Sequence, residues 1–375
     1  MTRFRWTDLP ENEQEVFRLI RDNPFISQQA LADSVGLSRP SVANIISSLM
    51  KKELIKGKAY IVNESSPAVC IGGANVDRKY TAKDPLQWGT SNPTSSVQSA
   101  GGVARNIAEN LGRMETDTVL LTAAGRDVEW QLIEEATSPF VDLERTAFVS
   151  GASTGSYSAV LAPDGEMALA MADMDVFDSI TPDLIRRNES LLIRSSCLII
   201  DLNCPRESVE AVQQTARRGK IPLAVIAVSA PKMNRIPDSL DGITWLLTNR
   251  QETETSLGFS LDTREDWQKA CREWLTKGME KVIITDGAAG AVHAEREAPD
   301  ARHVPAGTPP AVVDVTGAGD AFSAALIRAQ LDGCSLDEAV RAGMRNAEAT
   351  LAVPETVRRD LHADSIYNHI ETEAE

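Results

Sequence analysis

The chain has 375 residues, of which 42% are apolar and 25% are charged, and its formal net charge is −16. These values are typical of a folded protein with more than one domain, and they exclude an intrinsically disordered chain. No apolar run is long enough to cross a bilayer and the N-terminus lacks a secretory apolar region, so we expect a cytoplasmic protein.

The charge is unevenly distributed along the chain. Residues 1–63 hold nine Lys and Arg against seven Asp and Glu, which leaves a net charge of −18 for the remainder. An acidic surface repels nucleic acid, so any contact with DNA is expected in the N-terminal part alone.

Residues 11–62 are typical of three helices followed by a short basic hairpin. Ser27 and Ser38 are suited to cap the second and third helices, and Gly36 provides the turn between them. Apolar residues recur at helical spacing in the third helix, which predicts that one of its faces packs inward.

This N-terminal stretch resembles winged helix-turn-helix regulators. We therefore expect residues 1–63 to form a DNA-binding domain, with a helical cap or a dimerisation module as the alternative. The small charge implies that a lone copy binds DNA weakly, so a homodimer on a DNA operator is expected. The residues expected to face DNA, from the third helix and the wing, are Arg39, Ser41, Asn44, Lys56 and Lys58.

Beyond a short linker at residues 64–67, strands and amphipathic helices alternate. The strand-like runs lie at 69–72, 119–123, 197–201, 223–228, 243–248 and 282–285. Such alternation predicts an α/β fold, with a mostly parallel central sheet flanked by helices, over residues 64–375.

One section interrupts the alternation. Residues 154–162 and 166–172 are strand-like and are joined through Asp164-Gly165, which is a strong hairpin signal. We expect a small β lid, built from residues 78–98 and 154–172, that excludes water from a phosphoryl-transfer site.

Residues 314–320, with the sequence DVTGAGD, directly precede a helical run. Small residues let the backbone approach a ligand closely, and consecutive amides at a helix start bind anions. The amides of Gly317, Ala318 and Gly319 would hold a terminal phosphate, and Asp320 would take a proton from an attacking hydroxyl. The alternative is an acid that merely stabilises a helix start.

Four motifs occur in the order typical of the ribokinase-like (PfkB) family, which the chain resembles over roughly three hundred residues. They are Gly72–Asp77, Gly101–Asn106, the N-x-x-E string Asn249–Glu252, and Asp314–Asp320. The resemblance implies an ATP-dependent kinase with Asp320 as the catalytic base. Because the chain has no G-x-x-x-x-G-K-[ST] string, an ordinary P-loop kinase is disfavoured.

The resemblance also implies roles for further residues. Asp77, Gly101, Gly102 and Asn106 would bind the substrate, since acid and amide groups suit sugar hydroxyls. Glu252 would bind Mg²⁺ through water, and Asp314 and Thr316 would bind a monovalent cation such as K⁺. The residues implied for the nucleotide are Asn249, Thr285, Gly287, Gly290 and Asn346.

Several strings look most like those of pseudouridine kinases within the family. The residues that carry this likeness are Asn92, Arg105, Tyr157 and Asp173. The Tyr157 ring offers a surface for a nucleobase, and Arg105 and Asp173 would address a base edge or the ribose. We therefore expect phosphorylation of the 5′-hydroxyl of pseudouridine, with two alternatives: a kinase for another nucleoside or sugar, and a ligand-sensing transcription regulator.

Overall fold

The computed structural model describes residues 9–56, 66–307 and 312–367. The chain divides into two compact units, Met1–Ser65 and Ser66–Glu375. Within the described residues, no helix is long and apolar enough to cross a membrane.

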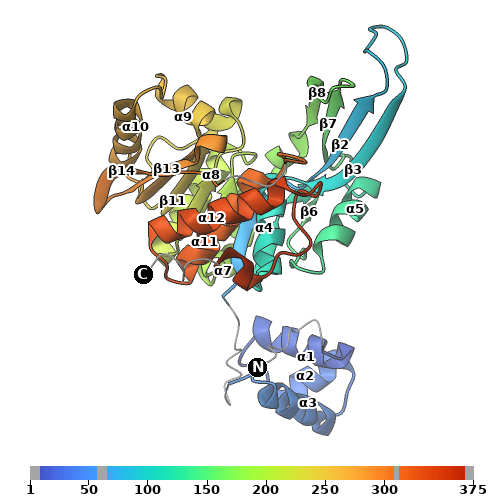
Figure 1. Ribbon diagram of the computed structural model, residues 1–375. Coiled ribbons are helices and arrows are strands. Elements are labelled where there is room, and N and C mark those ends of the chain that lie inside the picture. Colours follow the sequence, from blue (N-terminus) through green and yellow to red (C-terminus); the bar gives the residue numbers. More distant parts are fainter. Residues whose placement is uncertain (1–8, 57–65, 308–311, 368–375) are drawn as a thin grey trace. The chain divides into compact units, whose positions relative to one another are not determined.

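The N-terminal unit is a small helical domain with its own apolar core (Figure 1). The Ser27 hydroxyl accepts a hydrogen bond from the Ala30 amide, and the Ser38 hydroxyl accepts one from the Ser41 amide. Gly36 adopts a φ of 66° at the turn between the second and third helices, a conformation that glycine allows at little cost. The caps and the turn predicted from the sequence are therefore present. The helices of the N-terminal unit are α1 (Glu11–Asp22), α2 (Gln28–Val35) and α3 (Arg39–Lys51).

The larger unit is built on an eight-stranded sheet. In sheet order the strands are β14 (Ala298–Val304), β13 (Ala291–Glu295), β12 (Lys281–Thr285), β11 (Trp245–Asn249), β10 (Leu223–Ile226), β9 (Cys197–Asp201), β1 (Ala68–Ile71) and β4 (Thr118–Leu121). The pairs from β12 to β4 are parallel, whereas β13 and β14 are antiparallel. The mostly parallel sheet predicted from the sequence is therefore confirmed.

Helices cover both faces of this sheet (Figure 1). One face packs against α4 (Val103–Arg113), α5 (Val128–Thr137), α11 (Ala318–Leu331) and α12 (Leu336–Leu351). The other packs against α6 (Pro182–Arg187), α7 (Glu189–Ile193), α8 (Arg206–Gly219) and α10 (Arg264–Thr276). Successive residues of β1 belong to opposite cores, with Cys70 in the first and Ile71 in the second. This alternation explains why the parallel strands are continuous apolar runs.

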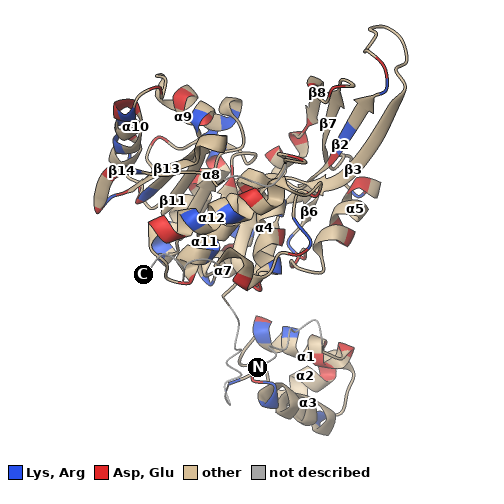
Figure 2. Ribbon diagram, viewed as in Figure 1, with Lys and Arg blue, Asp and Glu red and all other residues tan. Residues whose placement is uncertain are grey.

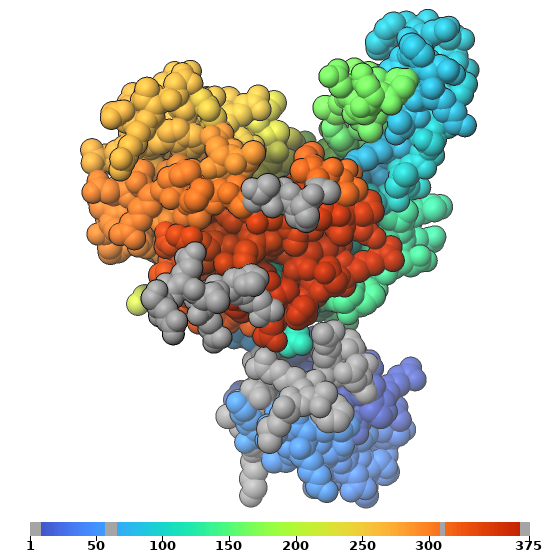
Figure 3. Space-filling view, viewed as in Figure 1, coloured from blue at the N-terminus to red at the C-terminus, as the bar shows by residue number. Residues whose placement is uncertain are grey.

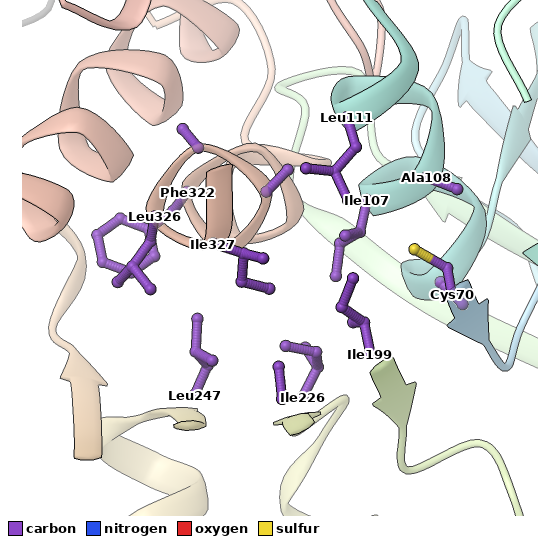
Figure 4. Packing of buried hydrophobic residues seen from close by; sticks show 14 of the residues in the cluster. Cys70, Ile107, Ala108, Leu111, Ile199, Ile226, Leu247, Phe322, Leu326 and Ile327 are labelled. Atoms are coloured by element: carbon purple, nitrogen blue, oxygen red, sulfur yellow. The ribbon is translucent and has the colours of Figure 1, made fainter. Parts of the chain in front are cut away.

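The apolar side of α11 fixes this helix to the sheet. Leu326 and Ile327 point toward the strands, where they meet residues such as Ile226 and Leu247 (Figure 4), and the Phe322 ring lies against Gly343 of α12. Because buried aromatic and aliphatic side chains hold a helix firmly in place, the start of α11 has a fixed position relative to the sheet.

A second, four-stranded sheet forms the expected β lid. Its order is β3 (Thr94–Gly101), β2 (Asn75–Ala82), β7 (Gly155–Leu161) and β8 (Met167–Asp173). The β7–β8 turn has Gly165 at a φ of 89°, and the Ala162 amide donates to the Glu166 carbonyl, as in the predicted hairpin. The surface is hollowed between this lid and the body of the unit (Figure 3).

Shorter elements complete the larger unit. They are β5 (Ala123–Ala124), which pairs with β6 (Ala147–Phe148), the helix α9 (Arg250–Leu257), and the 3₁₀ turns η2 (Asp175–Ser179), η3 (Ala230–Arg235), η4 (Gly287–Ala289) and η5 (Ala363–Ile366).

Candidate active site

The start of α11 is open to a ligand. Gly317 occupies the cap position with a φ of 84°, and no side chain caps the helix. A Cβ atom at Gly317 would lie 2.2 Å from the Thr356 carbonyl oxygen, so only glycine fits there. No described residue accepts a hydrogen bond from the amides of Gly319 and Asp320. Free first-turn amides at a helix N-terminus are suited to hold an anion.

Asp320 lies in the first turn of α11 and is partly buried. Its carboxylate accepts a hydrogen bond from Asn106 Nδ2 at 2.7 Å. Burial raises the pKa of Asp320 to about 7, and the negative charges of Asp201 and Asp77 add to this shift, whereas the Asn106 hydrogen bond opposes it. A carboxyl group that titrates near neutral pH can accept a proton and release it again.

Arg105 holds the side chain of Asn106 in place through a buried hydrogen bond. Its Nε donates to Thr137 Oγ1 at 2.9 Å, one terminal nitrogen donates to Asn106 Oδ1 at 2.9 Å, and the other pairs with Glu109. Only 3% of Arg105 is exposed. The buried guanidinium fixes the Asn106 amide, whose other end faces Asp320, and the expected contact of Arg105 with the substrate stays a prediction.

Asp77 lies on β2, on the face of the lid that it shares with Tyr157, since the two residues are in register on neighbouring strands. A Cβ atom at Gly101 would lie 2.2 Å from Asp77 Oδ2, and one at Gly102 would lie 2.5 Å from the Gly73 carbonyl oxygen. The first two motifs are therefore in contact, and the paired glycines make this contact possible. Burial raises the pKa of Asp77 as well.

Asp201, at the end of β9, was not identified from the sequence. It is fully buried, and its Oδ2 accepts hydrogen bonds from the Gly73 amide at 2.9 Å and the Ala104 amide at 3.0 Å. Gly73 belongs to the Asp77 motif and Ala104 to the Asn106 motif, so one carboxylate joins both. Only its position at the carboxyl end of a predicted strand could have indicated this role.

The two predicted substrate residues of strands β7 and β8 lie on opposite faces of the lid. The Tyr157 ring shares the face of Asp77, and its hydroxyl lies 3.7 Å from Met167 Sδ. Asp173 is exposed on the opposite face, because it is in register with Ser156 rather than with Tyr157. This geometry does not support a substrate contact for Asp173.

Asn92 lies in the loop at the far end of the β2–β3 hairpin. Its side chain accepts from the Gln87 amide at 2.8 Å and donates to the Gln87 and Thr90 carbonyls. The amide thus closes its own loop, and the expected substrate contact of Asn92 stays a prediction.

The N-x-x-E string begins helix α9. Asn249 Oδ1 accepts from the Glu252 amide at 2.9 Å, and Glu252 Oε2 accepts from the Asn249 amide at 2.7 Å, which is a capping box. Burial raises the pKa of Glu252. Its second oxygen, Oε1, has no hydrogen-bond partner among the described residues. One free carboxylate oxygen fits a role in holding hydrated Mg²⁺.

The residues predicted to bind the nucleotide differ in how deeply they are buried. Thr285 ends β12, and Gly287 and Gly290 follow it in a loop with φ values of 52° and 107°. Asn346, in contrast, is fully buried in α12, where it donates to the Ala321 carbonyl at 2.9 Å and accepts from Arg358 Nε at 3.1 Å. These contacts give Asn346 a structural role, and its expected contact with the nucleotide stays a prediction.

Asp314 and Thr316, the expected monovalent-cation ligands, are joined by Lys79 of the lid. Lys79 Nζ pairs with Asp314 Oδ2 and donates to Thr316 Oγ1 at 2.9 Å. Asp314 Oδ1 accepts from the amide and the hydroxyl of Thr316, at 2.9 and 2.7 Å. Lys79 was not identified from the sequence. The side-chain oxygens expected for a cation are thus already engaged by an ammonium group.

The helical unit presents part of the expected DNA-facing surface. Arg39 and Asn44 are exposed on α3 and Lys56 is exposed beyond it, whereas the Ser41 hydroxyl lies 2.8 Å from that of Ser38. Lys58 and the predicted wing lie outside the described residues. Blue and red residues are interspersed over this unit (Figure 2), so its charge alone does not mark a DNA-binding face.

Comparison with known proteins assigns the chain to a family. Residues 66–361 match the pfkB family of carbohydrate kinases, and residues 9–56 match a winged helix-turn-helix DNA-binding domain. The pseudouridine kinase of Escherichia coli is 30% identical over 311 residues, which cover 83% of this chain and 98% of the relative. An uncharacterised sugar kinase of the same organism, YeiI, is 30% identical over 355 residues, or 94% of this chain and 97% of its own.

A solved structure agrees with this assignment. A carbohydrate kinase from Agrobacterium tumefaciens superimposes with a TM-score of 0.70 at 30% identity, covering 81% of this chain and 96% of that one. The ribokinase-like fold predicted from the sequence is therefore confirmed. This chain belongs to the PfkB family of sugar and nucleoside kinases and carries a winged helix-turn-helix domain before its kinase domain.

Proposed function

We propose that the protein transfers the γ-phosphoryl group of ATP to the 5′-hydroxyl of pseudouridine, giving pseudouridine 5′-phosphate and ADP. One observation carries this proposal: Asp320, with a pKa near 7, stands at an uncapped helix start beside Asn106 and the Asp77 motif. A base, an anion-binding cradle and hydroxyl-binding groups are the parts that phosphoryl transfer to an alcohol requires.

The steps follow from these positions. Asp320 takes the proton of the 5′-hydroxyl as its oxygen forms a bond to the γ-phosphorus. The bond from that phosphorus to the oxygen bridging the β- and γ-phosphates breaks, and ADP leaves with the electron pair. The amides of Gly319 and Asp320 stabilise the charge on the transferring group, whereas the Ala318 amide, also expected in this cradle, donates to the Val315 carbonyl. When bound, Mg²⁺ would neutralise phosphate charge, with Glu252 Oε1 holding one of its waters.

The choice of a nucleoside rests on the lid. Asp77 and Asn106 offer an acceptor and an amide to ribose hydroxyls, and the Tyr157 ring shares the Asp77 face, where a base could stack. The likeness to a pseudouridine kinase supports pseudouridine within this class. The alternatives are another nucleoside and a free sugar, the latter supported by the likeness to YeiI.

A panel of substrates tests the proposal. ATP consumption would be measured with pseudouridine, uridine, inosine, adenosine and ribose, with Asp320→Asn as the background. We expect the highest kcat/KM for pseudouridine. Equal values for uridine and pseudouridine would remove the selectivity, and a preference for ribose would favour a sugar kinase.

The helix-turn-helix domain supports a second activity. We infer that α3 binds DNA as part of a homodimer, because Arg39 and Lys51 on this helix have no ion-pair partner among the described residues, whereas Glu13 and Glu15 pair with Lys52 and Arg18. Unpaired cations can replace the counterions of phosphate groups.

Gel shifts with the DNA upstream of the coding sequence test this activity at several salt concentrations, with and without nucleoside. We expect binding that weakens steeply with salt and that is reduced in the double variant Arg39→Ala, Asn44→Ala. If DNA bound but no substrate were phosphorylated, the kinase domain would act as a sensor. Absence of binding even at low salt would leave the domain a structural role.

A further inference from the structure

A closed cluster of three side chains joins the lid to the phosphate cradle. Lys79 Nζ contacts Asp314 Oδ2 and Thr316 Oγ1, and the Thr316 hydroxyl in turn donates to Asp314 Oδ1. The side chains of Lys79 and Asp314 are 31% and 22% exposed, so water reaches the cluster only in part. Every side-chain oxygen of the cluster already has a hydrogen-bond donor.

These contacts match what a bound monovalent cation would provide. An ammonium group has the charge of K⁺ and a similar size, and it binds to carboxylate and hydroxyl oxygens. The negative charge of the Asp314 carboxylate is thus balanced by Lys79, from within the chain.

A second cation does not fit the same oxygens. A K⁺ ion coordinated by Asp314 and Thr316 would have to share them with a positive group at hydrogen-bond distance, and like charges this close repel. Asp314 and Thr316 therefore do not fit the role of monovalent-cation ligands, because Lys79 already binds to their oxygens.

The position of the cluster links it to the reaction. Thr316 directly precedes Gly317, the cap residue of α11, so the ammonium charge lies beside the cradle. Lys79 is two residues beyond Asp77 on β2, so both side chains leave the same face of the lid. Lys79 thereby fixes the loop before α11 to the strand that carries the substrate-binding acid.

We propose that the side chain of Lys79 is a built-in substitute for a monovalent cation, so that this kinase works without K⁺. The proposal rests on the phosphoryl transfer proposed above. It makes Lys79 a positioning residue, since it acts through Asp314 and Thr316 on the cradle rather than on the reacting atoms.

Cation titrations test the proposal. Initial rates would be measured with the substrate that the panel identifies, at constant ionic strength of about 100 mM, as tetramethylammonium chloride is replaced by KCl or NH₄Cl. For the wild type we expect a change of less than about twofold. For Lys79→Met we expect a loss of about tenfold or more without K⁺, with recovery in KCl or NH₄Cl.

Arg78→Met is the matched control. Arg78 is the neighbouring lid cation, and it pairs at 2.7 Å with Glu129 on the opposite face of the strand. We expect this variant to show no dependence on K⁺. A wild-type enzyme that requires K⁺ would overturn the proposal, and so would a folded Lys79→Met enzyme that K⁺ fails to rescue.

Thermal unfolding gives a readout that needs no activity. We expect KCl to raise the Tm of Lys79→Met above its value in tetramethylammonium chloride, and to leave the wild type and Arg78→Met unchanged. If no substrate of the panel were phosphorylated, the proposed function would fail. The Tm values in KCl and in tetramethylammonium chloride would still show whether Lys79 takes the place of K⁺. A rise in the wild-type Tm with KCl would overturn the proposal that Lys79 takes the place of K⁺.

Discussion

Helices α9 and α11 both carry an acid at the third position of their first turn, and they use it in opposite ways. In α9, Glu252 turns back to its own cap residue, Asn249, and the two close a capping box. In α11, the cap residue is Gly317, which has no side chain, and Asp320 turns away to Asn106. The first helix start satisfies its own amides and the second leaves them for a ligand.

The difference shows how a site costs local stability. A glycine in place of a capping side chain costs a helix a few tenths of a kcal/mol, and α11, with Gly317 as its cap residue, bears this cost. Asp320 also carries a raised pKa, so its ionised form is disfavoured in the folded state. The packing of Leu326 and Ile327 against the sheet, and of Phe322 against α12, offsets these losses (Figure 4). Departures from the best local choice are expected where function requires them.

Replacing the acid of the open helix start should have the largest effect. We expect Asp320→Asn to lower kcat by about 1,000-fold, because the attacking hydroxyl loses its base. The Asn106 hydrogen bond can persist to the new amide oxygen, so the fold should be kept. Initial rates and KM for both substrates would be measured together with Tm.

The stability of the same variant provides its control. Between about pH 4 and pH 7 folded Asp320 keeps a proton that the unfolded chain releases, so the wild type loses stability as the pH rises through this window. Asn does not titrate, and we expect Asp320→Asn to be at least as stable as the wild type at pH 8. Wild-type turnover in this variant would show that Asp320 is not the base.

The pH profile should report the same group. We expect kcat/KM to fall about tenfold per pH unit below a midpoint near 7, since only ionised Asp320 accepts the proton. Replacing Asn106 with Leu removes a contact that lowers the Asp320 pKa, so the midpoint should rise. A profile that stays flat from pH 5 to pH 8 would contradict the raised pKa.

The glycines of the cradle separate folding from ligand binding. A Cβ atom at Gly319 would meet no atom within 4 Å, so Gly319→Ala should keep the fold. In the complex the methyl group would displace the phosphate, and we expect kcat/KM for ATP to fall by about 10- to 100-fold. Steady-state kinetics over a range of ATP concentrations would measure this loss.

Gly317→Ala is the contrasting variant. Its φ of 84° and the contact with the Thr356 carbonyl should cost about 2 to 3 kcal/mol of the free energy of unfolding. Urea unfolding curves of both variants would show the contrast. Full activity in Gly319→Ala would mean that the phosphate does not rest on this turn.

The fold was largely predictable because the parallel strands are buried on both faces. The run 197–201 coincides with β9, and Asp164-Gly165 forms the turn of the lid hairpin. The antiparallel strands β13 and β14 were not predicted. Charged residues such as Asp300 and Arg302 interrupt the apolar residues of β14, as is common at a sheet edge.

The order of the motifs indicated the site, but not which polar residues face a ligand. Asn106 and Asp320 are 214 positions apart and Lys79 and Asp314 are 235 apart, so these contacts depend on the tertiary structure. Arg105 is predicted to contact the substrate from the family resemblance, whereas its burial depends in part on Thr137, which is 32 positions away. A buried polar residue and a ligand-binding residue differ only in what surrounds them.

Replacing Glu252 at the start of α9 should have the smallest effect. We expect Glu252→Gln to keep the capping box, since the Gln oxygen can still accept from the Asn249 amide, and to change stability by about 1 kcal/mol or less. Loss of the charge should raise the Mg²⁺ concentration for half-maximal rate by about tenfold. The matched control is Glu338→Gln in the capping box of α12, where Glu338 accepts from the Ser335 amide at 2.8 Å. An equal Mg²⁺ response in both variants would show that Glu252 only caps its helix. The starts of α9 and α11 would then differ only in that α9 satisfies its own amides and α11 leaves them free.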